Sequence, residues 1–541
     1  MGHILAELRR KRKEADKKVM TNDQIPMTNE KDNDQYTNNQ LNKEKDRMDC
    51  MYHLWSLIIV CISGHWNLII GHWLFLFPVN KRLQEGRIPD INHKVVAGKV
   101  SVTPLGVAMQ DRKGDIVLSV GTDMKFLPLV LSFTESSSRI FGLEDRDALK
   151  LTLASEEMFA YLCGMTGEAR PVTLTMENGF YCALLRFAFD NIDFDPRAFN
   201  LTASVSPDEE GLGEMGLLIA SRSVDRMSIF HDPLEGTGIY LIKEKTYPEV
   251  EPWKSEEAPD CEGLSYGPPD VEDLKMFVRS IAGRYDPFVY PQDLRYPGKV
   301  VDMVASGEYG VLTATDTKGR MAGGMTWRST GTSTIECYGP YVFVEEGRQE
   351  VGEGLVMALI STVARSEAIC LMNRYPTAEL PPGYFEKLGT IDFVLKGERK
   401  PWDFLFRELK EDPGCRVYAH AGMEDFLKTR YKRHFLAREI VPVKYEGERQ
   451  NPHSVFGARF QHSQNLVVLS PLWDGADARE NLARHIEVLR AEGIANILFR
   501  IDLGYGWHAR LYPVIEANGF VPSIVIPYQG KADWLFFTLR D

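Results

Sequence analysis

The sequence predicts a multidomain protein of mixed α/β and α+β class. Its 541 residues are enough for three or four domains. Apolar residues alternate between strand-like and helix-like spacing along most of the chain. The order strand, loop, helix, strand also occurs twice in the second half, over 341–372 and 466–501. We therefore expect several packed α/β units, two of which repeat one design.

The amino end, residues 1–92, differs from the rest in composition. Residues 21–47 are rich in Asn, Asp and Lys, which predicts a disordered segment. Residues 51–79 lack Asp, Glu, Lys and Arg and are long enough to cross a bilayer of ~30 Å, but they contain polar residues that are costly in hydrocarbon, namely His53, His65, Asn67 and His72. Two interpretations stay open: a single membrane anchor, or an unstructured leader.

Charge and cysteine usage narrow the function classes. The net charge of −13 disfavours a general nucleic-acid binder, so we expect no nucleic-acid partner. The eight cysteines form no C-x-x-C pair, which predicts neither a zinc site nor a disulfide framework. This points to a reducing, cytoplasmic location. The alternative is a single-pass membrane anchor with cytoplasmic domains.

The first globular module is expected over 112–245. Interleaved helices and antiparallel strands favour an α+β sandwich. The expected helices are 126–141 and 151–163, and the expected strands are 114–120, 172–176, 181–189, 201–205 and 238–243. A glycine string, G-L-G-E-M-G at 211–216, leads into a further helix.

This module resembles the GHKL ATPases, in particular the small serine-kinase domains of bacterial anti-sigma factors. The resemblance implies a nucleotide-like site made of Glu157, Asp190, Gly211, Gly213 and Gly216. Two family positions differ: Tyr161 replaces the metal-binding asparagine, and Ile192 replaces a glycine. A phenol is a poor Mg²⁺ ligand. We therefore expect a degenerate domain that senses ATP or serves as a scaffold, with a regulatory protein as its partner.

A proline-bearing acidic linker at 246–263 precedes a module at 264–398. There, strand 341–344 runs into a turn and an amphipathic helix that begins with Gln349-x-x-Gly352-x-Gly354. Free N–H groups and the helix dipole favour an anion at such a turn, and glycine lets it approach closely. Strand 368–372 follows, then a helix that is expected to end at Tyr384 to Gly389.

This arrangement resembles the acyl-CoA-binding half of the GNAT N-acetyltransferases. The resemblance implies an acetyl-CoA cofactor whose diphosphate lies on the helix start and whose pantetheine pairs with the strand before it. The residues it assigns to CoA are Tyr341, Val342, Val344, Gln349, Gly352, Glu353 and Gly354. The acceptor it implies is an amine or a protein lysine.

Two residues are candidates for proton transfer. Glu336, on the strand beside the thioester, is the candidate base, and Tyr384 is the candidate acid for the leaving thiolate. The family's tyrosine position falls on Phe385, and Thr390 replaces an aromatic residue. The structural alternatives are a surface carboxylate for Glu336 and a packing aromatic for Tyr384. The pair Gly339-Pro340 predicts a bulge in this strand.

Residues 399–541 resemble a second GNAT-type fold, as in tandem-GNAT proteins. Helices are expected at 402–409 and 423–433, followed by strand 466–469, helix 479–492, strand 496–501 and a last helix at 507–517. Its phosphate loop is missing, because Gly475 stands among Asp474, Asp477 and Glu480. Carboxylates repel a diphosphate, so we expect no CoA in this copy.

These observations predict an acyl-CoA-dependent N-acyltransferase with a regulatory, nucleotide-binding-like domain. A second class stays open: a non-catalytic sensor of the anti-sigma type that binds CoA, ATP or both.

Overall fold

In this computed structural model, the described residues are 114–165, 169–189, 196–203, 209–232, 236–251, 253, 259–331 and 333–540. The predictions for residues 1–92, including the apolar segment 51–79, lie outside these ranges. Within the ranges, no helix combines the length and the apolar character that crossing a bilayer requires.

The first module is an antiparallel five-stranded sheet in the order β1-β2-β3-β5-β4. Its elements are β1 (Ile116–Gly121), α3 (Leu127–Ile140), α4 (Asp145–Met165), β2 (Pro171–Asn178), β3 (Cys182–Phe189), α5 (Glu209–Ser223), β4 (Arg226–Asp232) and β5 (Gly236–Glu244). Met158 and Leu162 of α4 pack against Leu174, Leu185 and Leu241 of the sheet, which buries one face. The expected sandwich is present.

Two details of this module differ from expectation. The strand predicted at 201–205 is wrong over its described part, because 201–203 form a turn after the short 3₁₀ helix Pro196–Phe199. Strand β4 was not predicted, since Arg226 follows directly on a helical stretch.

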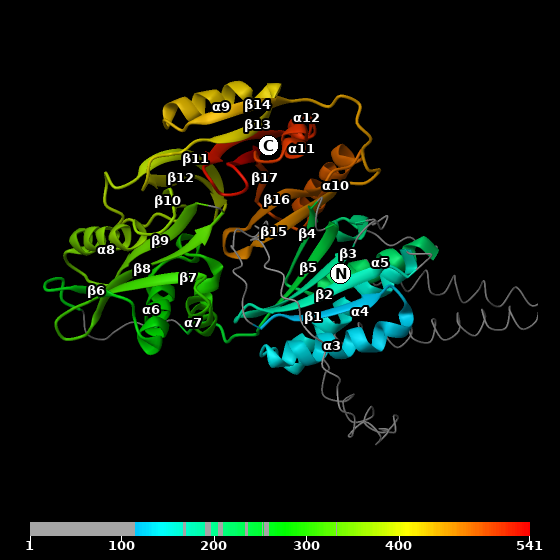
Figure 1. Ribbon diagram of the computed structural model, residues 1–541. Coiled ribbons are helices and arrows are strands. Elements are labelled where there is room, and N and C mark those ends of the chain that lie inside the picture. Colours follow the sequence, from blue (N-terminus) through cyan, green and yellow to red (C-terminus); the bar gives the residue numbers. More distant parts are fainter. Residues whose placement is uncertain are drawn as a thin grey trace, which may run out of the picture. The chain divides into compact units, whose positions relative to one another are not determined.

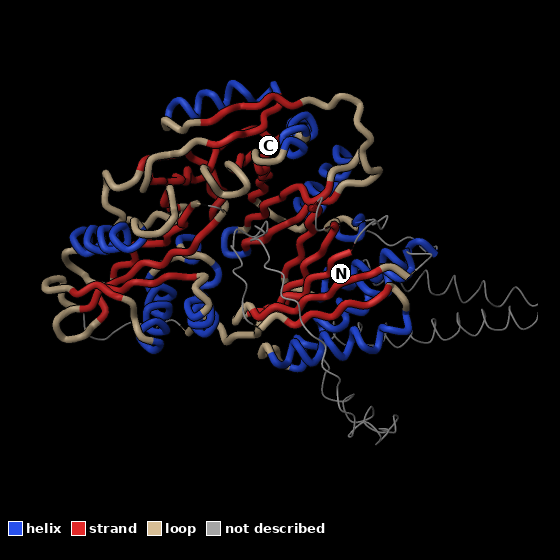
Figure 2. The backbone as a smooth tube through the Cα atoms, viewed as in Figure 1, coloured by secondary structure: helices blue, strands red, loops and turns tan. Residues whose placement is uncertain are grey.

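The second module is a seven-stranded sheet in the order β11-β12-β10-β9-β8-β7-β6 (Figures 1 and 2). Its elements are β6 (Ser265–Gly267), α6 (Val271–Arg284), α7 (Pro297–Ala305), β7 (Tyr309–Thr315), β8 (Met321–Thr330), β9 (Thr334–Val342), α8 (Arg348–Val363), β10 (Cys370–Asn373), β11 (Glu386–Leu395) and β12 (Glu398–Glu408). Only the pair β9–β10 is parallel; the other neighbouring strands run antiparallel.

Both faces of this sheet are covered, because successive strand residues point to opposite sides. Val311 packs with Phe277 of α6 and Val300 of α7. Its neighbour Leu312 packs with Leu355 of α8 in a separate core. The α8 helix therefore lies on one face, and α6 and α7 lie on the other (Figure 1).

Two predicted helices in this region are wrong. Tyr384 lies in a turn and β11 begins at Glu386, where the end of a helix was expected. Prolines at 376, 381 and 382 remove the N–H groups that a helix needs there. Residues 402–408 are strand, where a helix over 402–409 was expected, since β12 runs to Glu408 and pairs with β10 and β11.

The last five strands repeat the design of the second sheet. Their order is β15-β16-β17-β19-β18, which matches β8-β9-β10-β12-β11, and only β16–β17 is parallel. The elements are β15 (Val455–Gln461), β16 (Leu466–Trp473), α10 (Ala478–Ala491), β17 (Asn496–Asp502), α11 (Gly506–Arg510), α12 (Tyr512–Ala517), β18 (Phe520–Ile526) and β19 (Trp534–Leu539). This confirms the predicted internal repeat.

A small unit precedes this repeat: β13 (Cys415–His420), α9 (Ala421–Arg433) and β14 (Arg438–Val443). Its two strands pair in parallel. Helix α9 confirms the helix predicted at 423–433.

The repeat shares a buried core with the second module. Phe393 and Phe404 of the second module pack there with Leu498 and Phe536 of the repeat. Gly389 approaches Ile524 so closely that a Cβ would lie 2.4 Å from its side chain. These two sheets are therefore packed against each other.

The first module reaches the repeat through buried Asn200. Its side chain donates to the Ser454 carbonyl (2.9 Å) and accepts from the Phe456 N–H (3.0 Å) and the Asn481 amide (3.2 Å). A buried amide with three partners fixes this contact.

Candidate functional site

The predicted CoA site lies where β9 and β10 part. The two strands pair over Thr334–Cys337 and Cys370–Asn373, and β9 then continues without β10. The β8–β9 register skips Gly339 and Pro340, joined by a cis peptide bond, which confirms the predicted bulge. We call the edge of β9 that faces away from β8, from residue 338 to 344, the seam.

The chain itself enters this seam after β10. Asn373 donates to the Gly339 carbonyl (2.8 Å), and Thr377 donates to the Pro340 carbonyl (2.7 Å). We call residues 374–384 the strap. Thr377 is buried, so this part of the strap occupies the space next to the seam.

The next seam groups are also bonded. Phe343 donates to Ala322 of β8, so the N–H and carbonyl of Val342 point away from β8. The Val342 N–H donates to the Tyr285 hydroxyl (2.7 Å), which in turn lies 3.2 Å from the Val342 carbonyl. The carbonyl of Val344 accepts from Arg348 (2.9 Å). These are the backbone groups with which a pantetheine would have to pair.

The start of α8 is covered by the strap as well. Gly347, at φ +66°, is the N-cap. Arg348 pairs with the Glu379 carboxylate, and the Gln349 amide donates to the Ala378 carbonyl (3.2 Å). A Cβ on Gly352 would lie 2.4 Å from the Glu379 carbonyl oxygen.

The second glycine of the motif faces a different neighbour. A Cβ on Gly354 would lie 2.0 Å from the hydroxyl of Tyr266, on β6. Gly352 is therefore required by a close backbone approach, whereas the atom near Gly354 is the end of an exposed tyrosine side chain, which can move aside. The motif predicted the close approach of a diphosphate instead. The atoms that approach belong to this chain.

Glu336 is fully buried and ion-paired. It bonds to Arg374 and to the Tyr338 hydroxyl (2.8 Å), and Arg328 lies 3.4 Å away. Burial opposes its ionisation, but the arginines and the hydrogen bonds lower its pKa to about 2. A carboxylate that holds its proton so weakly is a poor general base near neutral pH. It is also not the surface carboxylate that was the structural alternative.

Tyr384 lies at the end of the strap, away from Glu336. Its hydroxyl donates to Glu353 (2.7 Å), and this hydrogen bond is the main cause of its raised pKa. Its carbonyl accepts from Arg407 (2.9 Å). The structure thus joins Tyr384 to Glu353 of α8 rather than to the proposed base.

The strand residues predicted to bind CoA are part of the core. Tyr341, Val342 and Val344 are all buried. The Tyr341 ring packs edge-on to Tyr285 and Phe277, and its hydroxyl donates to the Val289 carbonyl (3.1 Å). Their side chains serve packing in this arrangement.

In the first module, the structure brings two predicted residues together. A Cβ on Gly216 would lie 2.5 Å from the carboxylate of Glu157. Burial raises the pKa of Glu157 to about 7, and the neighbouring Glu156 adds to the rise. All three glycines of the string lie inside α5 rather than in the predicted loop, and Asp190 lies outside the described residues.

Sequence reasoning missed the residues that close the site. Tyr285 is the C-cap of α6, Arg374 follows β10, and Thr377 and Glu379 lie in the strap. One signal was available: prolines at 376, 381 and 382 exclude the helix that was expected after β10. Nothing in the local sequence indicated where this segment would go.

No family model matches the chain, and no curated protein matches it. Solved acetyltransferases match in structure. A putative acetyltransferase from Acinetobacter baylyi is 13% identical, with 27% of this chain and 92% of that chain covered and a TM-score of 0.24. A putative GNAT-family acetyltransferase from Desulfovibrio desulfuricans is 16% identical (27% and 99% covered, TM-score 0.22).

A third match is an aminoglycoside 6'-N-acetyltransferase solved with coenzyme A. It is 13% identical, covers 28% of this chain and 99% of its own, and has a TM-score of 0.22. Each of these proteins is matched over almost its whole length by little more than a quarter of this chain. The likeness concerns the fold alone.

Proposed function

We propose that the chain is a ligand-binding regulatory protein built on two GNAT-type folds, in which the strap takes the place of bound CoA. One observation supports this most directly. The seam groups of Pro340, Val342 and Val344 are all bonded to side chains of this same chain. A pantetheine would have to displace these partners one by one.

The state of Glu336 supports the same proposal. Acyl transfer to an ammonium group needs a base that can take a proton near neutral pH. Glu336 is instead buried between Arg328 and Arg374, and its pKa is lowered to about 2.

A second candidate is N-acyl transfer from acetyl-CoA to an amine or a protein lysine. The parallel pair β9–β10 that parts beyond Asn373, and the glycines at the start of α8, favour this candidate. It requires the strap to leave the seam, which breaks the bonds of Thr377 and Glu379.

Direct assay separates the two candidates. The chain is incubated with acetyl-CoA and with spermidine or a lysine-rich peptide, and acetylated product is measured by mass spectrometry. We expect no product from the wild type or from Glu379→Gln, which frees Arg348 at the start of α8. Acetylated amine from either protein would replace the regulatory proposal with the transferase.

For the first module, we propose a GHKL-like scaffolding or nucleotide-sensing role that acts on a regulatory protein partner. The side chain of Glu157 against Gly216 disfavours a phosphate there, because it fills the space at Gly216 and becomes anionic above its pKa of about 7. The buried contact of Asn200 with Ser454 gives this module a route to the second GNAT-like copy. A rise in melting temperature with ATP would support sensing, and no rise would support the scaffold.

A further inference from the structure

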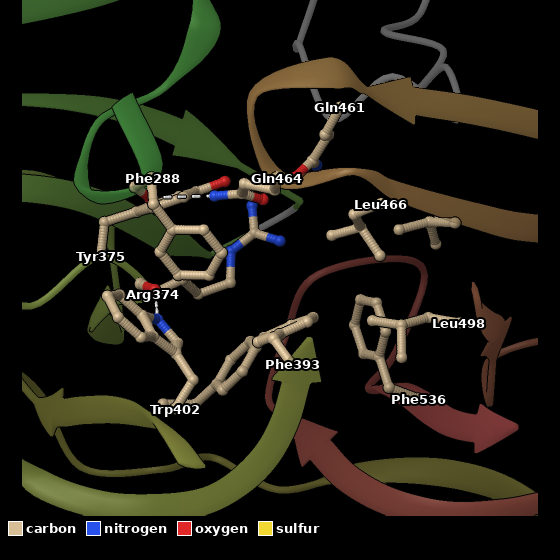
Figure 3. A pocket seen from close by; sticks show the side chains of 12 residues that line it. Phe288, Arg374, Tyr375, Phe393, Trp402, Gln461, Gln464, Leu466, Leu498 and Phe536 are labelled. Atoms are coloured by element: carbon tan, nitrogen blue, oxygen red, sulfur yellow. Dashed lines mark hydrogen bonds between the residues drawn. The ribbon is translucent and has the colours of Figure 1, made fainter. Parts of the chain in front are cut away.

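Several arginines converge between the two packed sheets. A cavity there has a volume of about 30 Å³, room for about one or two waters. Arg374 from the second module reaches into it beside Gln461 and Gln464, which come from the repeat (Figure 3). Aromatic side chains form much of the remaining lining, among them Phe288, Phe393 and Trp402.

Strand alternation places two more arginines on the same face. Gln461 is paired with Leu466, and Arg459 is paired with Val468, so both lie on the face of β15 that carries the cavity lining. On β17, Leu498 lines the cavity, and Arg500 follows two residues later on the same face. Arg459 is exposed and Arg500 is half-buried, so both lie at the rim, in contact with solvent.

The nearby carboxylates already have partners within the chain. Glu336 pairs with Arg374 itself and with Arg328. Asp502, on the same face of β17, accepts from the N–H groups of Gly504, Lys531 and Ala532 at 2.8, 2.7 and 3.2 Å.

Among the residues that the structure describes, neither Arg459 nor Arg500 has a carboxylate within ion-pair distance. The Arg500 guanidinium lies 3.7 Å from the centre of the Trp534 ring, which offers only a partial substitute for an anion.

The arginines therefore repel one another. Desolvation by the surrounding protein, followed by repulsion from Arg459, lowers the pKa of Arg500 to about 9. The Arg459 side chain reaches solvent, but the protein around it displaces part of its water, and this desolvation, followed by repulsion from Arg328, Arg226 and Arg374, lowers its pKa. An arginine normally has a pKa above about 12. At these two sites desolvation and neighbouring cations therefore outweigh the attraction of Asp502 for Arg500 and of Asp293 for Arg459. Unfavourable interactions between like charges, as among these arginines, are typical of functional sites.

We propose that Arg459, Arg500 and Arg374 bind a small polyanion, a molecule that carries at least two carboxylate or phosphate groups. Guanidinium groups bind both kinds of oxygen through paired hydrogen bonds, and three of them from two packed sheets suit a ligand with several anionic groups. Such a ligand bridges the second module and its repeat. This inference rests on the proposed regulatory function in one respect: it names the class of ligand that such a regulatory protein would bind.

Binding is tested by calorimetry and thermal shift at pH 7.5, with citrate as the carboxylate probe and pyrophosphate as the phosphate probe. NaCl at matched ionic strength is the control. We expect one probe to bind and to raise the melting temperature above the NaCl value. Arg459→Gln and Arg500→Gln should each weaken that binding about tenfold or more. The matched control Arg416→Gln removes an exposed arginine of β13 that is paired with Glu439, and it should leave binding unchanged.

The ligand-free variants give a second readout. Removal of one of two repelling cations should raise the melting temperature of the ligand-free protein for Arg459→Gln and Arg500→Gln. The proposal is overturned if neither probe exceeds NaCl, or if both variants bind the probe as the wild type does. Acetylated amine in the assay above would overturn the regulatory function but not the polyanion site, so the two failures are distinguishable.

Discussion

The phenol of Tyr285 closes the edge of β9 at Val342. Its oxygen accepts the Val342 N–H at 2.7 Å and lies 3.2 Å from the Val342 carbonyl. Tyr285 is the C-cap of α6, whereas Val342 ends β9, so one side chain ties the helix layer to the strand at the point where the sheet opens. A ligand that pairs with this strand must first displace that hydroxyl.

Tyr285→Phe should therefore destabilise the protein. The variant leaves the buried Val342 N–H without its partner, which costs about 1–3 kcal/mol of unfolding free energy. Urea unfolding followed by fluorescence measures the change. Tyr445→Phe is the matched control, because Tyr445 is exposed and its hydroxyl donates to the nearby Glu448 carbonyl, so this variant should stay near wild type. Equal stability of both variants would mean that the seam is not closed by Tyr285 in solution.

Glu336→Gln should lower the unfolding free energy by about 3–5 kcal/mol at pH 7, because it leaves Arg328 and Arg374 buried without their anion. The folded-state pKa of Glu336 is lowered from 4.5 to about 2, so its contribution is complete above pH 4.5 and is lost as the pH falls towards 2.

The difference between wild type and Glu336→Gln should thus narrow from pH 5 to pH 3 in chemical denaturation. Glu350→Gln, in the exposed first turn of α8, serves as the control. A pH-independent difference would contradict the ion-paired state of Glu336.

Glu157→Gln should stabilise the protein, and more so at higher pH. The folded-state pKa of Glu157 is raised from 4.5 to about 7, so the folded protein keeps a proton that the unfolded chain releases between these values. Wild-type stability therefore falls as the pH rises from 4.5 to 7, and a neutral glutamine avoids that loss. Melting temperatures at pH 4.5, 6 and 8 check this. The exposed Glu346→Gln should show no such trend.

The order of helices and strands could be predicted where the spacing of apolar residues along the sequence specifies the type of element. Leu355, Leu359 and Val363 mark one face of α8, and all three are buried as expected. The second copy was found for the same reason, since its strand–helix–strand order repeats in the sequence. Both depend on side-chain spacing within one element.

The closure of the site could not be predicted from such patterns. Thr377 reaches Pro340 across 37 positions, and Arg374 reaches Glu336 across 38. These contacts are set by strand order and register, which the spacing within one element does not contain. The glycines at 352 and 354 were expected to admit a diphosphate, but in the structure the strap lies against Gly352 and the Tyr266 hydroxyl lies against Gly354.

Two glycine replacements test whether the strap covers the start of α8 or leaves it free to hold a diphosphate. In a helix, alanine is more favourable than glycine by about 1 kcal/mol. Gly164, near the end of α4, has nothing within 4 Å of an added Cβ, so Gly164→Ala should raise the melting temperature. Gly352→Ala places a Cβ 2.4 Å from the Glu379 carbonyl oxygen, and moving this backbone should cost about 1–3 kcal/mol. Stabilisation by both replacements would mean that the strap leaves α8 in solution and that the turn is free to hold a diphosphate.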